Sequence, residues 1–194
     1  MNSFPESAIV HQHYRPSTEL LSAADELGVR LVTTLRDPYD QFVSLYFYVQ
    51  RFAEAYREAD DAAQAMIGQP LNAPAVLDFL RGGFGRYLEQ GVAWLRSGRS
   101  VIVRYEALSS APLETLVRAT NEIEPVGRDV LQAALEDATA DRMRQSSPDM
   151  RAHIRSATVG DWRRHLTGVH VAAMNVHGDL LDALGYGNGA RGPR

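Results

Sequence analysis

The sequence contains no cysteine and no lysine, and each absence excludes a set of chemistries. Without cysteine there are no disulfide bonds, no thiolate metal ligands and no cysteine nucleophile. All 20 basic residues are arginine, which excludes Schiff-base chemistry, a lysine general base and the lysine form of a phosphate-binding loop. A codon bias toward GC-rich triplets accounts for the missing lysine without any functional cause.

Long hydrophobic runs and strong net charge are absent too. No stretch approaches the roughly 18 apolar residues of a membrane span, and the start MNSFPESAIV lacks the basic end and apolar centre of a secretory signal. The net charge of −4 argues against nucleic-acid binding, which needs a basic surface. We therefore expect a cytoplasmic protein that spans no membrane and binds no nucleic acid.

Hydrophobic periodicity predicts strands that alternate with helices. The strands are expected over residues 7–10, 30–35 and 100–104. The helices are expected from Ser17 to Gly28, from Asp37 to about Asp60, over 75–94 with a break at glycines 82–85, and over 109–123, 126–138 and 168–184. The segments 60–75 and 139–160 are expected to be mostly irregular.

This alternation is typical of an α/β protein in which helices cover a parallel sheet. The sequence has no internal repeat and no linker, so we expect one domain over residues 1–186 and a disordered tail over 187–194. A covered parallel sheet of three strands would be unusually small. Part of the sheet is therefore expected either among strands that the pattern does not show or outside this chain.

The end of the strand 30–35 predicts an anion site. Arg36 follows that strand and precedes a helix that Asp37 caps, and α/β proteins bind anions at such an edge. Ser44 comes about two turns after Asp37, on the same helix face. Arg36 and Ser44 could hold one phosphate by a charged fork and a hydroxyl group. The alternative is that Arg36 pairs with Asp37 or Asp40 across the turn.

Two segments carry a family resemblance. The run LRDPYDQFVSLYFY resembles the 3′-phosphate-binding segment R-[ND]-P-x-D-x-x-x-S-x-Y of sulfotransferases that use 3′-phosphoadenylyl sulfate (PAPS). Residues 155–167, RSATVGDWRRHLT, resemble the family segment R-K-G-x-x-G-D-W-[KR]-x-x-[FL]-[ST], with Ser156 and Ala157 in place of Lys-Gly. The resemblance implies that Arg36, Ser44, Arg155 and Gly160 bind the donor nucleotide.

Further segments resemble the same family. IVRYEAL is similar to the family's strand ending in Y-E-D-L, which implies that Tyr105 lies near the adenine. IVHQHYRP is similar to K-T-H-L-P, which implies that His13 is the general base, with His11 as the alternative. Histidine suits this role because it titrates near neutral pH, although a lone histidine at a strand end more often makes structural hydrogen bonds. Residues 79–94 resemble a stretch that lines the acceptor pocket.

The resemblance implies a helix-rich, P-loop-NTPase-like three-layer α/β/α fold with a parallel sheet. One part of the family pattern has no counterpart: the strand, Gly/Ser/Thr-rich turn and helix that form the 5′-phosphosulfate loop. The glycines from Gly82 to Gly85 lack its Ser/Thr pair and lie between helical segments. We expect an N-terminally truncated chain in which this strand and loop are missing. The alternative is a natural short protein that has lost the chemistry.

The implied function is transfer of a sulfuryl group from PAPS to a hydroxyl or amine of a small-molecule or glycan acceptor. The reaction requires no metal, and His165, His170 and His177 are not expected to bind one. The alternative is an inactive domain that binds adenosine 3′,5′-bisphosphate or a partner. A P-loop kinase relative or a helical interaction protein fits the ordered motifs less well. The sequence leaves the acceptor and the oligomeric state open.

Overall fold

The computed structural model describes residues 9–11, 13–59, 61–146 and 157–187. In this part the chain is a helix-rich α/β protein with a small parallel sheet. The elements in chain order are α1 (Thr18–Glu26), β1 (Val32–Leu35), α2 (Pro38–Arg51), α3 (Ala53–Ala59), α4 (Asp61–Gln64), α5 (Pro74–Arg81), α6 (Gly85–Ser97), β2 (Val101–Arg104), α7 (Tyr105–Ser110), α8 (Pro112–Asn121), α9 (Arg128–Asp137), α10 (Ala140–Ser146), the 3₁₀ helix η1 (Asp161–Arg164), α12 (Gly168–Met174), the 3₁₀ helix η2 (Asn175–His177) and α13 (Gly178–Ala183).

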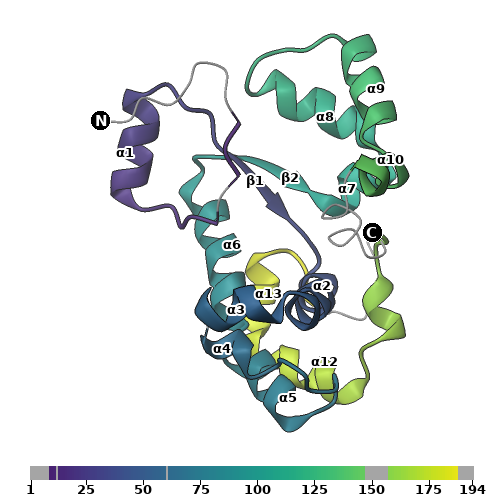
Figure 1. Ribbon diagram of the computed structural model, residues 1–194. Helices are drawn as coiled ribbons and strands as arrows, with labels where there is room; N and C mark the ends of the chain where they lie inside the picture. Colours follow the sequence, from purple (N-terminus) through teal and green to yellow (C-terminus); the bar gives the residue numbers. More distant parts are fainter. Residues whose placement is uncertain (1–8, 12, 60, 147–156, 188–194) are drawn as a thin grey trace.

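The sheet of the described residues consists of β1 and β2, which pair in parallel. Val32 lies opposite Val101, and Leu35 lies opposite Arg104. Parallel strands need a long crossover, which α2 to α6 provide here. Because the strands run in the same direction, both end at one edge of the sheet, near the start of α2 (Figure 1).

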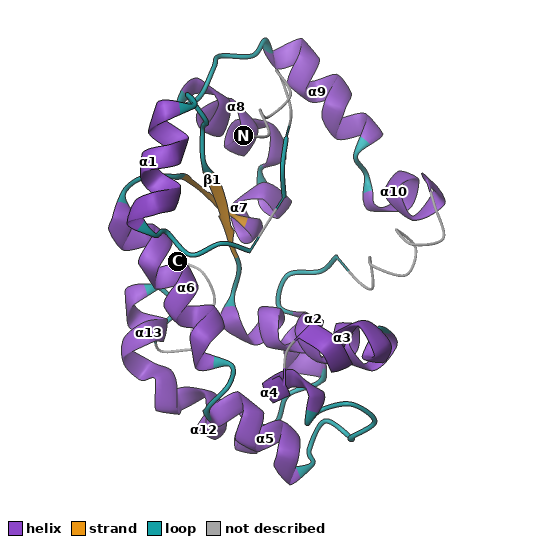
Figure 2. Ribbon diagram, turned by 60° about the vertical axis from the view of Figure 1, so that its left-hand side comes forward, coloured by secondary structure: helices purple, strands orange, loops and turns teal. Residues whose placement is uncertain are grey.

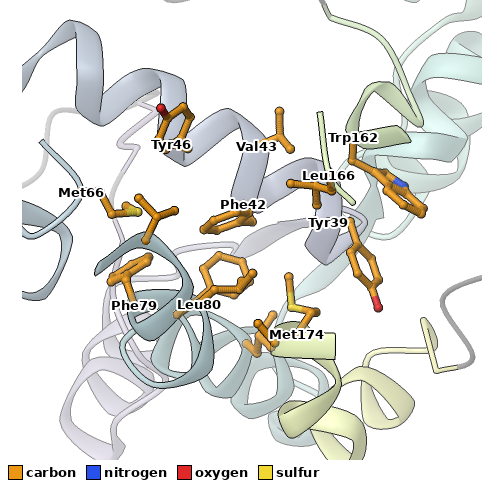
Figure 3. Packing of buried hydrophobic residues seen from close by; sticks show 14 of the residues in the cluster. Tyr39, Phe42, Val43, Tyr46, Met66, Phe79, Leu80, Trp162, Leu166 and Met174 are labelled. Atoms are coloured by element: carbon orange, nitrogen blue, oxygen red, sulfur yellow. The ribbon is translucent and has the colours of Figure 1, made fainter. Parts of the chain in front are cut away.

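The hydrophobic core lies between α2, α5, α6 and the C-terminal helices α12 and α13 (Figure 3). Phe42 of α2 is fully buried, and its ring packs edge to face on Phe84 with 5.5 Å between ring centres. Leu80, Leu88 and Met174 are fully buried around them. Burial of such a side chain contributes about 1.5–3 kcal/mol, so this cluster holds α2 in place and fixes where its first turn meets the sheet.

The helices α8, α9 and α10 lie on the other side of the sheet from α5 and α12, as both ribbon views show (Figures 1 and 2). They connect to the rest of the fold through α7 and β2. None of the described helices is both long and apolar enough to cross a membrane.

Several local predictions are confirmed. Ser17 caps α1 with its side chain, and Gly28 after that helix has a φ of 66°. The strands predicted over 30–35 and 100–104 form as β1 and β2. The carboxylate of Asp37 caps α2, and Pro38 occupies the first position of that helix.

Several predictions of secondary structure are wrong. No strand forms at residues 9 and 10, where Ile9 is fully exposed, because so short an apolar run has no surface to pack on; residues 7–8 lie outside the described part. Residues 140–146 form α10, a mainly exposed helix without the apolar stripe that would have shown it in the sequence. The helix predicted over 168–184 is interrupted by η2. Residues 188–194 of the predicted tail also lie outside the described residues.

Substitution of Phe42 by alanine tests the core. We expect Phe42→Ala to lower the free energy of unfolding by about 3–5 kcal/mol, because it removes a buried ring and leaves a cavity. The matched control is Val130→Ala, since Val130 is 57% exposed on α9 and should change stability by less than about 0.5 kcal/mol. Urea unfolding measures both values, and equal effects of the two substitutions would contradict this description of the core.

Candidate functional site

The register of the sheet brings two of the predicted site residues together. Because Leu35 pairs with Arg104, the next residues, Arg36 and Tyr105, leave the strands side by side. The guanidinium carbon of Arg36 lies 4.4 Å from the centre of the Tyr105 ring, a cation–π contact. Nη2 of Arg36 donates a hydrogen bond to the carbonyl oxygen of Thr158 at 3.3 Å, and its buried Nε has no hydrogen-bond partner among the described residues.

The two aspartates beside Arg36 accept hydrogen bonds from backbone amides and not from the guanidinium. Asp37 accepts hydrogen bonds from the amides of Tyr39, at 2.8 Å, and Asp40, at 3.4 Å. The buried carboxylate of Asp40 accepts from the amides of Gly160, at 2.6 Å, and Trp162, at 2.9 Å. In the described part of the chain no carboxylate forms an ion pair with Arg36, so pairing across the turn is not what the structure shows.

The loop from Ala157 to Trp162 lies against the start of α2. The Trp162 ring stacks on Tyr39 with 4.8 Å between ring centres (Figure 3). Gly160 has a φ of 78°, and Ala157 has a φ of 53°, a region that glycine adopts most easily. Ala157 is the position at which the family segment has glycine, so this chain keeps the turn at the cost of backbone strain in an alanine.

A second set of hydrogen bonds holds the residue after Arg36. Glu106, in the first turn of α7, accepts a hydrogen bond from the backbone amide of Asp37 at 2.7 Å and from the hydroxyl of Tyr186 at 2.9 Å. Burial, together with the bond to Glu106, raises the pKa of Tyr186 above its usual value. Burial is also the main cause of a raised pKa at Asp37. The chain end after α13 is thereby tied to the strand edge.

The remaining predicted residues occupy different places. Ser44 is exposed on α2, and its hydroxyl has no hydrogen-bond partner among the described residues. Arg155 lies outside the described residues. Gly160 lies in the loop from Ala157 to Trp162 and donates its amide hydrogen bond to Asp40. These positions leave the shared role of Arg36, Ser44 and Arg155 a prediction.

The candidate base lies in a segment that runs along α6. His13 is exposed, and its ring meets that of His11 edge to face with 5.2 Å between ring centres. The carbonyl oxygen of the next residue, Tyr14, accepts hydrogen bonds from Trp94, at 2.8 Å, and Gln90, at 3.0 Å. His13 therefore does not stand at a strand end as expected, and its role as base stays a prediction.

The other histidines have structural contacts. His170 is buried, where Nδ1 contacts the amide and hydroxyl of Thr167, and Nε2 lies 3.1 Å from the carbonyl oxygen of Leu71. His165 lies 3.3 Å from the carboxylate of Asp161. Within the described ranges, no three His, Asp or Glu side chains gather in a way that could hold a metal ion.

Sequence reasoning did not assign the contacts of Asp40, Glu106 and Tyr186. Asp40 was visible as an acid in the first turn of a helix, which has a local explanation in the helix dipole, and as one position of the family segment. Glu106 was visible only as part of the strand-end segment. For Tyr186 the sequence carried no signal beyond its place just after the helix predicted over 168–184.

Most of the chain matches a known protein family. The model of the sulfotransferase domain matches residues 2–177. The chain belongs to the sulfotransferase domain family. This confirms the resemblance of the motifs, and sulfotransferases of this family normally take PAPS as co-substrate and act on small-molecule acceptors. A search of curated proteins gave no match.

Replacement of Asp37 tests the buried cap by its pH dependence. Because the pKa of Asp37 is higher in the folded protein than its ordinary value of 3.8, the protonated side chain favours folding below pH 3.8. This contribution to stability is lost as the pH rises through the pKa of the folded state. Asparagine also caps helices but cannot ionise. The free energy of unfolding of Asp37→Asn minus that of the wild type should therefore rise as the pH rises above 3.8. Urea unfolding across that window measures it, and a difference that falls with pH would contradict the assignment.

Proposed function

We propose that this protein transfers a sulfuryl group from PAPS to a hydroxyl or amine of a small-molecule or glycan acceptor. The observation that carries the proposal is that no carboxylate among the described residues pairs with Arg36. Its guanidinium lies where the parallel strands end, and both neighbouring aspartates accept hydrogen bonds from backbone amides. A positive charge with no carboxylate partner among the described residues suits a doubly charged phosphate.

The proposed donor site is built around that charge. Arg36, Ser44 and Arg155 hold the 3′-phosphate, and the loop at Gly160 closes beside it. Tyr105 offers an aromatic ring to the adenine. In this structure the guanidinium of Arg36 lies over that ring. The start of α2 adds the favourable potential of a helix N-terminus. The proposed fold is the P-loop-like three-layer arrangement, of which β1 and β2 supply two strands.

The proposed reaction is an in-line displacement at sulfur. The acceptor oxygen or nitrogen forms a bond to sulfur while the bond from sulfur to the phosphate oxygen of PAPS breaks. The acceptor proton passes to His13, and adenosine 3′,5′-bisphosphate leaves. Arg36, Ser44 and Arg155 contribute orientation of the donor. No segment of the sequence matches the family's 5′-phosphosulfate loop, and the proposal gives the task of stabilising the leaving group to none of these residues.

That missing match favours a second candidate function. A chain that binds adenosine 3′,5′-bisphosphate through Arg36 without catalysing transfer would need the 3′-phosphate site alone. It shares every contact argued above and differs only in the absence of turnover.

Substitution of Arg36 tests the nucleotide site, which both functions share. Arg36→Ala should weaken binding of adenosine 3′,5′-bisphosphate by about 10-fold or more, because a charge-assisted hydrogen bond to phosphate contributes about 1.5–3 kcal/mol. Arg81→Ala is the matched control, since Arg81 is an exposed arginine paired with Asp78 on α5. Titration calorimetry measures both, and unchanged affinity of Arg36→Ala would remove the site.

A transfer assay separates the two functions. Sulfur-labelled PAPS is incubated with the wild-type protein and a panel of phenols, alcohols, amines and sugars. If the protein is a transferase with His13 as base, His13→Ala should lower kcat about 10²–10⁴-fold with nucleotide affinity unchanged, while His11→Ala keeps its activity. Nucleotide binding without transfer to any acceptor would favour the second function, and full activity of His13→Ala would overturn the base.

A further inference from the structure

A buried carboxylate joins two parts of the candidate site that are far apart in sequence. Asp40 is 1% exposed, and its two oxygens face different backbone amides of the segment 157–162. Oδ2 accepts a hydrogen bond from the amide of Gly160 at 2.6 Å, and Oδ1 accepts one from the amide of Trp162 at 2.9 Å. These partners are 120 and 122 residues from Asp40 in the sequence. A buried carboxylate without partners is costly, so these two bonds are needed wherever Asp40 is buried.

The same loop holds Arg36 in place. The carbonyl oxygen of Thr158, two residues before Gly160, accepts the hydrogen bond from Nη2 of Arg36 at 3.3 Å. The positive φ of Gly160, 78°, lets the chain turn between this carbonyl and the amides that face Asp40. A continuous path therefore runs from the first turn of α2 through Asp40 and the loop to the guanidinium of Arg36.

The other contact between loop and helix is weaker. The stack of Trp162 on Tyr39 is a single aromatic pair, which adds little beyond the burial of the two rings. Asp40 accepts two backbone hydrogen bonds in a buried place, where the loss of a partner is costly. The stack restrains the tryptophan ring, whereas the carboxylate fixes the backbone on which Thr158 and Gly160 lie.

We propose that Asp40 is a positioning residue of the 3′-phosphate site: it fixes the loop 157–162 against α2 and thereby sets the orientation of Arg36. This inference rests on the proposed function, because it assigns the loop to the phosphate that Arg36 binds. Asp40 itself stays buried and touches no ligand. Its effect on affinity should be confined to ligands that carry a 3′-phosphate.

The test compares two nucleotides on one variant. Asparagine matches aspartate in shape but has one acceptor oxygen, and its NH₂ group would face a loop amide that also donates. Wild-type protein should bind adenosine 3′,5′-bisphosphate more tightly than adenosine 5′-phosphate. Asp40→Asn should lose about 10-fold of the bisphosphate affinity and keep its affinity for adenosine 5′-phosphate, as measured by titration calorimetry. The control is Asp78→Asn, an exposed aspartate on α5, which should keep both affinities.

The outcomes separate the inference from the function on which it rests. If Asp40→Asn keeps the wild-type preference for the bisphosphate, or loses both affinities alike, the positioning role is wrong and the nucleotide site stands. If wild-type protein shows no preference for the bisphosphate, the proposed function fails and the positioning role fails with it.

A measurement on the wild-type protein keeps the test open if Asp40→Asn does not fold. Hydrogen exchange should find the amides of Gly160 and Trp162 protected, because Asp40 accepts from both. The bisphosphate should slow their exchange further, and adenosine 5′-phosphate should not. Fast exchange of both amides, or equal slowing by the two nucleotides, would overturn the positioning role.

Discussion

The site depends on where two carboxylates find their hydrogen bonds. Asp37 and Asp40 flank the start of α2, and each is close enough in sequence to Arg36 to neutralise it. Both instead accept hydrogen bonds from backbone amides, Asp37 from the first turn of α2 and Asp40 from the segment 157–162. Arg36 therefore has no carboxylate ion-pair partner among the described residues, which suits an anionic ligand at this edge of the sheet.

Packing and pairing together place that charge. The parallel register puts Arg36 beside Tyr105, while the core around Phe42 fixes the helix that follows. Hydrogen bonds of Glu106 to Asp37 and Tyr186, and of Asp40 to Gly160, then tie the strand edge to later segments of the chain. The guanidinium itself contacts Tyr105 and the carbonyl oxygen of Thr158, two residues far apart in the sequence, which suits a group whose task is orientation.

The sequence predicted the parts of this arrangement that neighbouring residues determine. Asp37 and Pro38 begin a helix by local chemistry, and the β-branched run before them forms a strand, so the position of Arg36 followed directly. The bonds of Asp40 to the loop could not be predicted, because they join residues 120 apart and periodicity carries no such information. The strand expected over residues 7–10 does not form at its described residues, 9 and 10, for a related reason: a short apolar run forms a strand only where a partner strand pairs with it.

A crystal structure with adenosine 3′,5′-bisphosphate tests the central claim most directly. The account predicts the 3′-phosphate within hydrogen-bond distance of the Arg36 guanidinium, the adenine near Tyr105, and the bonds of Asp40 to Gly160 and Trp162 retained. A nucleotide bound elsewhere on the protein, with Arg36 still resting on Tyr105, would contradict it.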